Sequence, residues 1–191
     1  GRTTMPNPIG RALRDRRAGH DKVVWERAGL QAPDSFTLTS PAFAGGGPIP
    51  EEYKGRLFGQ DLSPELAWTA PPVATEELVL VVEDPDAPRR QPAVHVIACG
   101  IDPALGGLPE GALARHTPPD GVAYGRGSLG SRGWHGPMPV PSHGPHTYVF
   151  QLFAVDRRID LPESFGLEDV VRAMHGHVIA RARLDGTYET P

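Results

Sequence analysis

The sequence predicts a mainly β protein in which two antiparallel sheets pack against each other and helices lie at the periphery. Three apolar runs have the length of β-strands and are followed by prolines or charged residues; they are 78–83, 94–101 and 146–156. The 22 prolines and 23 glycines among 191 residues alternate with such runs, which is typical of strands joined by shaped loops. A helical pattern near the carboxyl end predicts a helix laid against one flank of the sheets.

The first 34 residues are predicted to form an amino-terminal helical arm, separate from a second unit at 35–191. Ile9 and Leu13 in a basic run predict a short amphipathic helix, which Gly19 would end. A flexible arm, an interface element and a helix that covers a sheet edge are all compatible with this pattern. We favour a peripheral helical arm.

The strands of the second unit follow from local patterns taken in chain order. Phe36 and Leu38 predict a first strand, and a short element at 66–68 ends before two prolines. The run 78–83 is continuously apolar, which is typical of a strand covered on both faces, and 94–101 repeats that pattern. The run 146–156 is rich in aromatic and β-branched residues and is the clearest strand of the chain.

The spacing of apolar residues predicts a helix over 167–184, with an extended segment after it. Val170, Val171 and Met174 recur at helical spacing. Glu168 and Asp169 suit the first turn, because acidic side chains interact favourably with the positive end of the helix dipole.

Composition and charge exclude several classes of function. The net charge of −4 and the pI near 6.1 argue against a nucleic-acid partner, because such binding needs a basic face. The segment 125–130 fits the pattern GxGxxG, but a loop rich in glycine and proline follows it instead of the required helix, so we attribute the match to chance. We find no apolar run long enough to span a bilayer and no secretory signal pattern, and therefore expect a cytoplasmic protein without stable membrane insertion.

Chemistry is concentrated in one turn, one strand and one loop. Asp84 and Asp86 lie in the proline-bounded turn DPDAP (84–88), where the prolines limit the conformations of both carboxylates. His95 lies within an apolar strand pattern, and the segment 133–148 is a proline-rich loop that can hold the shape of a pocket wall. Each feature also has a purely structural explanation, as a rigid loop or as a histidine satisfied in the core.

A fixed order of segments carries a resemblance to a known family. The segments are SPELAW (63–68), DPDAP (84–88), His95, HTYVFQLFAVD (146–156) and AMHGHVIARARLDGTY (173–188). Their order and spacing resemble the phosphatidylethanolamine-binding protein (PEBP) family, especially its bacterial branch of Raf kinase inhibitor-like proteins. The resemblance covers about 35–188 and leaves the arm outside.

The resemblance implies a PEBP-like β-sandwich with a small pocket that binds phosphate, phosphoryl head groups or carboxylates without catalysing a reaction. The residues carried over to this pocket are Asp84, Asp86, His95, Pro137, His146 and Tyr148, with His177 as a further candidate. The resemblance also implies a protein partner such as a kinase or a protease, and pairing into a homodimer. No cofactor and no metal are expected.

The residue types agree with such a pocket. Imidazole N–H and phenol O–H groups donate hydrogen bonds to an anion, whereas carboxylates do not bind one directly. An aspartate can instead orient a histidine ring and favour its charged form. We therefore expect Asp84 or Asp86 to do this for His95 or His146.

The chain departs from the family pattern at several positions. Thr147 stands where the family has arginine, Val96 where tryptophan is usual, and His135 where glycine is common. Met138 and Val140 interrupt the usual run of prolines. These departures bear on the size of the pocket and on its ligand preference.

Two other functions are compatible with the same Asp/His cluster. A metal site could use His135, His143 and His146 with the aspartates, although their spacing matches no established zinc pattern. A hydrolase could use Ser142 beside His143, or Asp86 with His146, although no motif joins a nucleophile to a base.

Overall fold

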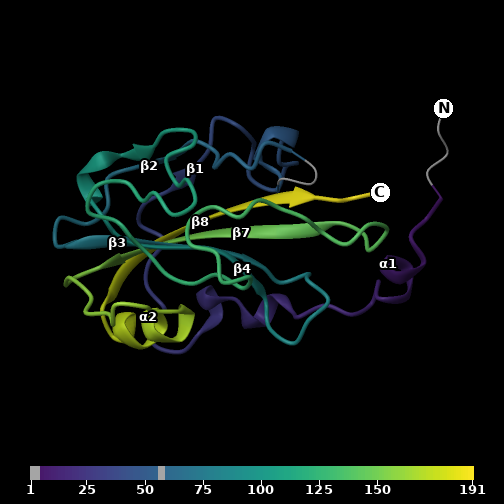
Figure 1. Cartoon of the computed structure of the whole chain (residues 1–191). Helices are drawn as coiled ribbons and strands as arrows, with labels where there is room; N and C mark the ends of the chain where they lie inside the picture. Colours follow the sequence, from purple (N-terminus) through teal and green to yellow (C-terminus); the bar gives the residue numbers. More distant parts are fainter. Residues whose placement is uncertain (1–4, 56–58) are drawn as a thin grey trace.

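Eight strands in two antiparallel sheets form the framework of the computed structural model, which describes residues 5–55 and 59–191 (Figure 1). The small sheet has the order β1 (Leu38–Thr39), β2 (Leu66–Trp68), β5 (Gly107–Leu108). The large sheet has the order β6 (Ala123–Tyr124), β4 (Ala93–Ile101), β3 (Glu77–Asp84), β7 (His146–Val155), β8 (Val178–Tyr188). The α-helices are α1 (Pro8–Ala12) and α2 (Leu167–Met174). The predicted mainly β fold with two antiparallel sheets and peripheral helices is confirmed.

Strand β3 is the centre of the large sheet and is buried on both faces. It pairs antiparallel with β4 along one edge and with β7 along the other. Leu78, Leu80 and Val82 belong to the core that faces the small sheet, whereas Val79 and Val81 belong to the core on the opposite face. The continuous apolar run of this strand is thus explained by burial on both sides.

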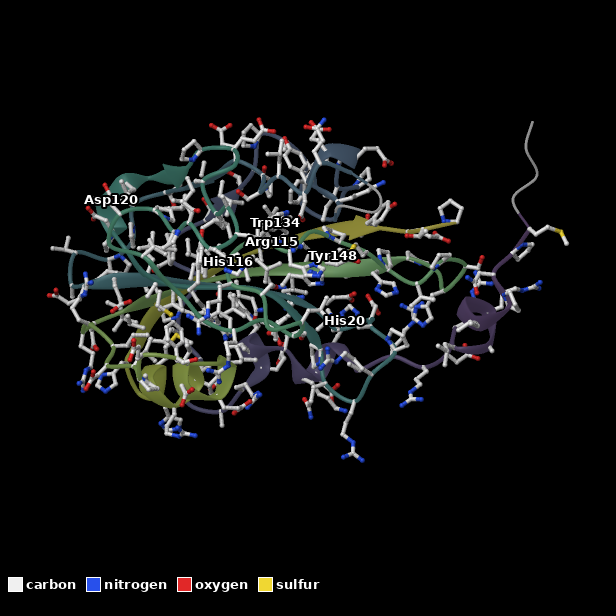
Figure 2. The ribbon with its side chains drawn as sticks, viewed as in Figure 1. His20, Arg115, His116, Asp120, Trp134 and Tyr148 are labelled. Carbon is white, nitrogen blue, oxygen red and sulfur yellow. The ribbon has the colours of Figure 1, made fainter. Side chains whose placement is uncertain are left out.

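The arm and α2 cover the face of the large sheet that points away from the small sheet (Figure 1). The arm contains two short 3-10 turns, at His20–Lys22 and Val24–Glu26. Figure 2 labels His20, the first residue of these turns. Val24 and Leu30 are fully buried and pack with Met174 of α2. Part of the arm therefore contributes to the hydrophobic core, and the division of the chain at residue 34 stays a prediction.

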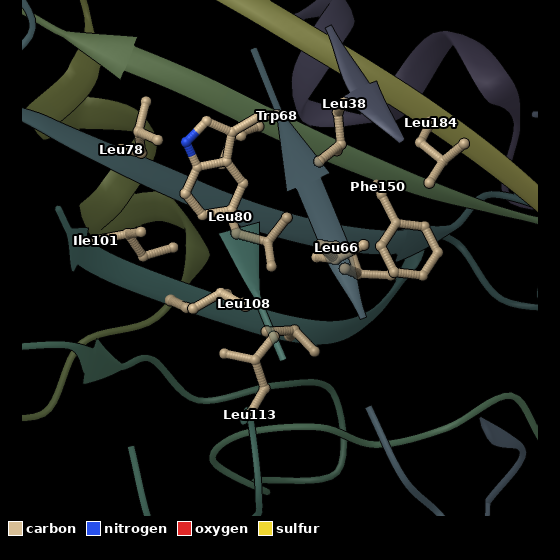
Figure 3. Close-up of a cluster of buried hydrophobic side chains, with 14 of the residues drawn as sticks. Leu38, Leu66, Trp68, Leu78, Leu80, Ile101, Leu108, Leu113, Phe150 and Leu184 are labelled. Atoms are coloured by element: carbon tan, nitrogen blue, oxygen red, sulfur yellow. The ribbon is translucent and has the colours of Figure 1, made fainter. Parts of the chain in front are cut away.

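A second cluster of buried side chains joins the two sheets (Figure 3). Leu38, Leu66 and Trp68 of the small sheet lie in this cluster with Leu80 and Phe150 of the large sheet. Burial of apolar area is worth roughly 25 cal/mol per Å², so this shared cluster is what holds the short strands of the small sheet in place.

The carboxyl-terminal helix is shorter than predicted, and the prediction is wrong for 175–184. Helix α2 ends at Met174, and Gly176 then adopts a φ of +80°, a left-handed conformation that commonly follows a helix end. From Val178 the chain forms β8 and pairs with β7 along its whole length. Its buried side chains are Ala180, Ala182 and Leu184, and they alternate with Arg181, Arg183 and Asp185. This period of two belongs to a strand.

Helix α1 is also shorter than the amphipathic pattern suggests. It ends at Ala12, and Ile9 is 65% exposed, so it buries no apolar stripe. Gly10 is buried instead, because its backbone approaches the carbonyl oxygen of Pro141 so closely that a Cβ atom would lie 1.7 Å from that oxygen. The arm therefore docks through close backbone packing at this point.

A buried polar pair anchors the arm to the large sheet. The backbone N–H of Val24 donates to Glu83 Oε1 at 2.7 Å, and that of Trp25 donates to Gln151 Oε1 at 2.6 Å. Gln151 Nε2 also donates to Glu83 Oε1 at 3.0 Å. Burial raises the pKa of Glu83, while the bonds from Gln151 and Val24 oppose the rise. Because backbone groups of the arm are bonded to two buried side chains, its position is fixed by more than apolar contact.

Replacing Gln151 with leucine is expected to destabilise the protein by about 1–3 kcal/mol, because the Trp25 N–H and the Glu83 carboxyl group lose a partner in a buried place. Urea unfolding followed by circular dichroism measures this change. Gln60→Leu is the matched control, since Gln60 is exposed. Equal midpoints for the two variants would contradict the anchoring role.

Candidate functional site

The DPDAP turn (84–88) holds its two carboxylates in different surroundings. Asp84 is the last residue of β3, and its Oδ1 accepts a hydrogen bond from the backbone N–H of Asp86 at 2.8 Å. This local bond closes the turn. Asp84 lies in the wall of a cavity, whereas the Asp86 carboxylate contacts the arm. The turn therefore separates the arm from the cavity.

The cavity has a volume of about 160 Å³ and is mostly apolar. Asp84, His95 and Tyr148 are polar residues of its wall and come from β3, β4 and β7. Apolar side chains in the wall include Ala87, Pro88, Val94, Leu129, Met138 and Val140. Small-molecule sites in proteins typically combine such apolar walls with a few convergent polar groups. The cavity therefore has the composition of a site for a small ligand.

The predicted pocket residues divide between the wall of this cavity and its surroundings. Those in the wall are Asp84, His95 and Tyr148. Asp86 and His146 do not line the cavity, and each is bonded to neighbouring groups behind it. The carbonyl oxygen of Pro137 accepts a bond from Gly55 N–H at 3.0 Å, while the following Met138 lines the cavity.

His95, in the wall of the cavity, is held in one tautomer. Its Nδ1 lies 2.6 Å from the carbonyl oxygen of His135, which can only accept, so Nδ1 carries the hydrogen. Burial lowers the pKa of His95 to about 4, against an opposing contribution from Asp84. The ring is therefore neutral at pH 7, and its Nε2 is an unprotonated acceptor.

Tyr148 presents a donor beside that acceptor. Its ring lies edge-on to that of His95, with centroids 5.3 Å apart. Burial and nearby carboxylates, Asp84 first among them, raise the pKa of Tyr148 well above its usual value, so the hydroxyl keeps its proton. Within the described part of the chain this buried hydroxyl has no hydrogen-bond partner. An unsatisfied buried polar group costs about 1–3 kcal/mol, which a ligand oxygen would recover.

A chain of hydrogen bonds runs from Asp84 through two histidines to the arm. Asp84 Oδ2 lies 2.6 Å from His146 Nδ1, and His146 Nε2 lies 2.7 Å from His143 Nδ1. His143 Nε2 lies 2.7 Å from the carbonyl oxygen of Leu13. Of the pairings between aspartate and histidine that the sequence left open, this structure forms the one between Asp84 and His146.

The chain of bonds fixes the number of protons that it holds. The three hydrogen bonds join Asp84 to His146, His146 to His143, and His143 to the carbonyl oxygen of Leu13. Each of them needs one hydrogen, because without it both of its atoms would be acceptors. Two neutral imidazoles supply two hydrogens, so the set carries one more. The extra hydrogen belongs to the set formed by Asp84 and the two rings, and Asp84 also accepts the Asp86 N–H.

Asp86 is bonded on the outer side of the turn. Its Oδ2 accepts the backbone N–H of Thr147 at 2.7 Å, and its Oδ1 lies 3.2 Å from Arg17 and 3.1 Å from His20. Burial alone would raise the pKa of Asp86, but the bond from Thr147 and the basic partners lower it overall. Asp86 is thus committed to the arm and to β7.

The segment 125–130 forms part of the cavity instead of a nucleotide site. Ser128 N–H donates to the carbonyl oxygen of Val94 at 3.0 Å, and Val94 N–H donates to Ser128 Oγ at 2.6 Å. These reciprocal bonds attach the loop to β4 and place Leu129, which is 71% exposed, in the cavity wall.

The remaining candidate residues are bonded elsewhere. His177 Nδ1 lies 3.1 Å from Asp156 Oδ1, just beyond the end of β7, whereas His146 begins that strand. Ser142 Oγ accepts the N–H of Asn7 at 3.0 Å. Across residues 5–55 and 59–191, no group of three or more histidines, cysteines and carboxylates is arranged to hold a metal ion.

Comparison with known proteins identifies the family. Residues 39–189 match the family model of the phosphatidylethanolamine-binding protein. The chain belongs to the phosphatidylethanolamine-binding protein family. This confirms the resemblance that the ordered segments indicated.

Relatives agree with this membership in sequence and in structure. A UPF0098 protein of Methanothermobacter thermautotrophicus is 38% identical over 153 residues, which are 80% of this chain and 98% of that protein. The crystal structure of a PEBP homolog, CT736, from Chlamydia trachomatis has a TM-score of 0.74 at 34% identity, over 83% of this chain and 99% of that one. Escherichia coli YbcL, described as a member of the mammalian PEBP family, has a TM-score of 0.74 at 27% identity, over 82% and 99%.

Sequence reasoning missed the residues of the arm that reach this candidate site. Arg17 and His20 contact Asp86, and the carbonyl oxygen of Leu13 ends the chain of bonds that starts at Asp84. The basic residues of the arm were a signal, since the DPDAP turn is acidic. Their pairing could not be inferred, because the family resemblance begins after the arm.

Asp84→Asn is expected to leave both histidine rings of the chain neutral. The asparagine oxygen can accept the Asp86 N–H while its NH₂ donates to His146 Nδ1, so every link is made without the extra proton. Long-range ¹H–¹⁵N spectra of the imidazole nitrogens at pH 7 measure the change, with the exposed His175 as an internal reference. A charged ring of His143 or His146 in the variant at pH 7 would refute the hydrogen count.

Proposed function

We propose that this PEBP family member binds small acidic ligands that have an apolar body, and that it does so without catalysing a reaction. The observation that carries the proposal is the contact of the Tyr148 and His95 rings in the wall of an apolar cavity, where the Tyr148 hydroxyl has no partner among the described residues and His95 Nε2 is an acceptor. A singly protonated phosphoryl group or a carboxylic acid offers an oxygen to the Tyr148 hydroxyl and an O–H to His95 Nε2. The apolar wall suits the rest of such a ligand.

The charges around the cavity indicate that such a ligand binds together with a proton. Arg89 is the one permanently cationic residue among the described residues of the wall, and it is exposed. His95 is neutral at pH 7, and Asp84 is hydrogen-bonded to His146 behind it. A bare anion would therefore enter a pocket without a positive charge at its floor. A proton on the ligand, or one taken up by His95, removes this penalty.

Family membership supports ligand binding in general, and several finer assignments stay predictions. Regulation of a kinase or a protease and pairing into a homodimer rest on the family resemblance. The described residues contain no helix that is long and apolar enough to cross a membrane. A Mycobacterium tuberculosis relative, LppC, that is 35% identical over 158 residues is named as a lipoprotein. The cytoplasmic location accordingly remains a prediction, which cell fractionation tests.

Tyr148→Phe is expected to weaken the binding of phenyl phosphate about tenfold, since a net hydrogen bond is worth about 1–1.5 kcal/mol. The variant removes only a hydroxyl that has no partner within the described residues, so the melting temperature should not fall. Isothermal titration calorimetry measures the binding. Tyr124→Phe is the control, because that hydroxyl contacts Thr117 outside the cavity. Equal affinity of the two variants would remove the main support for the proposal.

Affinity is expected to fall as the pH rises from 5 to 8. The pKa of His95 in the free protein is about 4, so a ring that becomes charged on binding takes up a proton throughout this range. One proton bound per ligand lowers the affinity up to about tenfold per pH unit. The groups that face His95 are Asp84, Arg89, His135, His146 and Tyr148.

Benzenesulfonate separates the sources of that proton, because a sulfonate does not titrate between pH 5 and 8. Calorimetry in two buffers of different ionisation enthalpy counts the protons taken up. Proton uptake with phenyl phosphate but not with benzenesulfonate assigns the proton to the ligand. Tight binding of both ligands at pH 8 without proton uptake would contradict the proposed mode.

A further inference from the structure

The arm reaches the candidate site at several points, although it lies outside the residues that match the family. The N–H groups of Ala18 and Gly19 donate to the carbonyl oxygens of Ala87 and Pro85, at 3.0 Å and 2.8 Å. The arm thus pairs with the outer side of the same turn whose inner side lines the cavity. We refer to residues 7–20 as the docked segment.

Arg17 connects the docked segment to both parts of the site. Its guanidinium donates to the carbonyl oxygens of Pro145 and His143, each at 3.0 Å, and contacts Asp86 at 3.2 Å. One side chain therefore joins the DPDAP turn to the loop that carries the two histidines. His20 adds a second contact to the Asp86 carboxylate.

The docked segment also determines which way the histidine chain is protonated. His143 Nε2 faces the carbonyl oxygens of Leu13 at 2.7 Å and Arg16 at 3.2 Å, so this nitrogen must carry a hydrogen. His143 then reaches Asp84 through His146. If the docked segment moved away, His143 Nε2 would face water, which both donates and accepts, and either ring tautomer would be allowed.

We propose that the docked segment is a functional part of the ligand site, and that Arg17 and the Leu13 carbonyl group are positioning elements that act through Asp86, His143 and Asp84. This inference rests on the proposed function, because its consequence is a change in ligand affinity. Coupling is reciprocal: if docking of the segment strengthens ligand binding, ligand binding also stabilises the docked segment. The ligand class stays that of a small acid with an apolar body.

Gly10→Ala tests the proposal without changing any charge. Alanine favours the helical conformation of α1 more than glycine does, but its Cβ would collide with the carbonyl oxygen of Pro141. We expect this variant to bind phenyl phosphate at least about fivefold more weakly than the unaltered chain, in the range typical of coupling between sites. We also expect altered ¹⁵N shifts for the rings of His143 and His146, which general loosening of the arm elsewhere would not produce.

Arg17→Ala, with Arg11→Ala as its matched control, provides a second route. Arg11 is exposed on the same arm and makes no side-chain hydrogen bond or ion pair within residues 5–55 and 59–191, so its loss should change neither the affinity nor the ring spectra. Arg17→Ala should change both in the same direction as Gly10→Ala. Because Arg17 is partly exposed, this variant keeps the proposal testable if Gly10→Ala does not fold.

The outcomes separate this inference from the proposed function. If the unaltered chain binds phenyl phosphate and the variants Gly10→Ala and Arg17→Ala bind it equally well, the docked segment has no role in the site. If the unaltered chain binds neither phenyl phosphate nor inorganic phosphate at pH 5 to 8, the proposed function fails. In that case the ring spectra still test whether the docked segment is coupled to the histidines. Identical spectra of His143 and His146 in the unaltered chain and in the variants Gly10→Ala, Arg17→Ala and Arg11→Ala would overturn the coupling.

Discussion

The Asp84 carboxylate is the group on which the rest of the site depends. One oxygen closes the DPDAP turn through the Asp86 N–H, and the other fixes the ring of His146. The same charge lies beside His95 and Tyr148 and acts on the ionisation of both. A single buried carboxylate thus sets the shape of the turn, the proton content of the histidine chain and the electrostatics of the cavity. Because Asp84 ends the most buried strand, the core of the sheet determines its position.

The fold could be predicted where a local pattern has only one interpretation. The runs at 78–83 and 146–156 are rich in β-branched and aromatic residues, which favour strands over helices. The segment 178–184 was ambiguous, because its apolar residues fit a helix that continues from α2 as well as a strand. The pairing of β8 with the edge of β7 decides that this segment is a strand, and this pairing is a tertiary interaction that a local pattern does not contain. The alternation of alanine with arginine at 180–183 was the available signal for a strand.

The candidate site could be predicted only in its polar centre. The resemblance to the PEBP family supplied Asp84, His95 and Tyr148, which do meet in one cavity. It could not distinguish residues that face the cavity from those that support it, since Asp86 and His146 occur in the same motifs. The contribution of the arm could not be predicted, because contacts between segments 66 or more positions apart leave no periodic signal in a single sequence.

The distance along the chain between the docked segment and its partners has a consequence for biosynthesis. Leu13 and His143 are separated by 130 positions, and β7 needs β8, the last strand, as a neighbour. At a translation rate of about 5–20 residues per second, the amino-terminal segment leaves the ribosome on the order of ten seconds before its docking surface exists. During that interval Val23 and Val24, both fully buried in the finished protein, are exposed to the cell and accessible to chaperones.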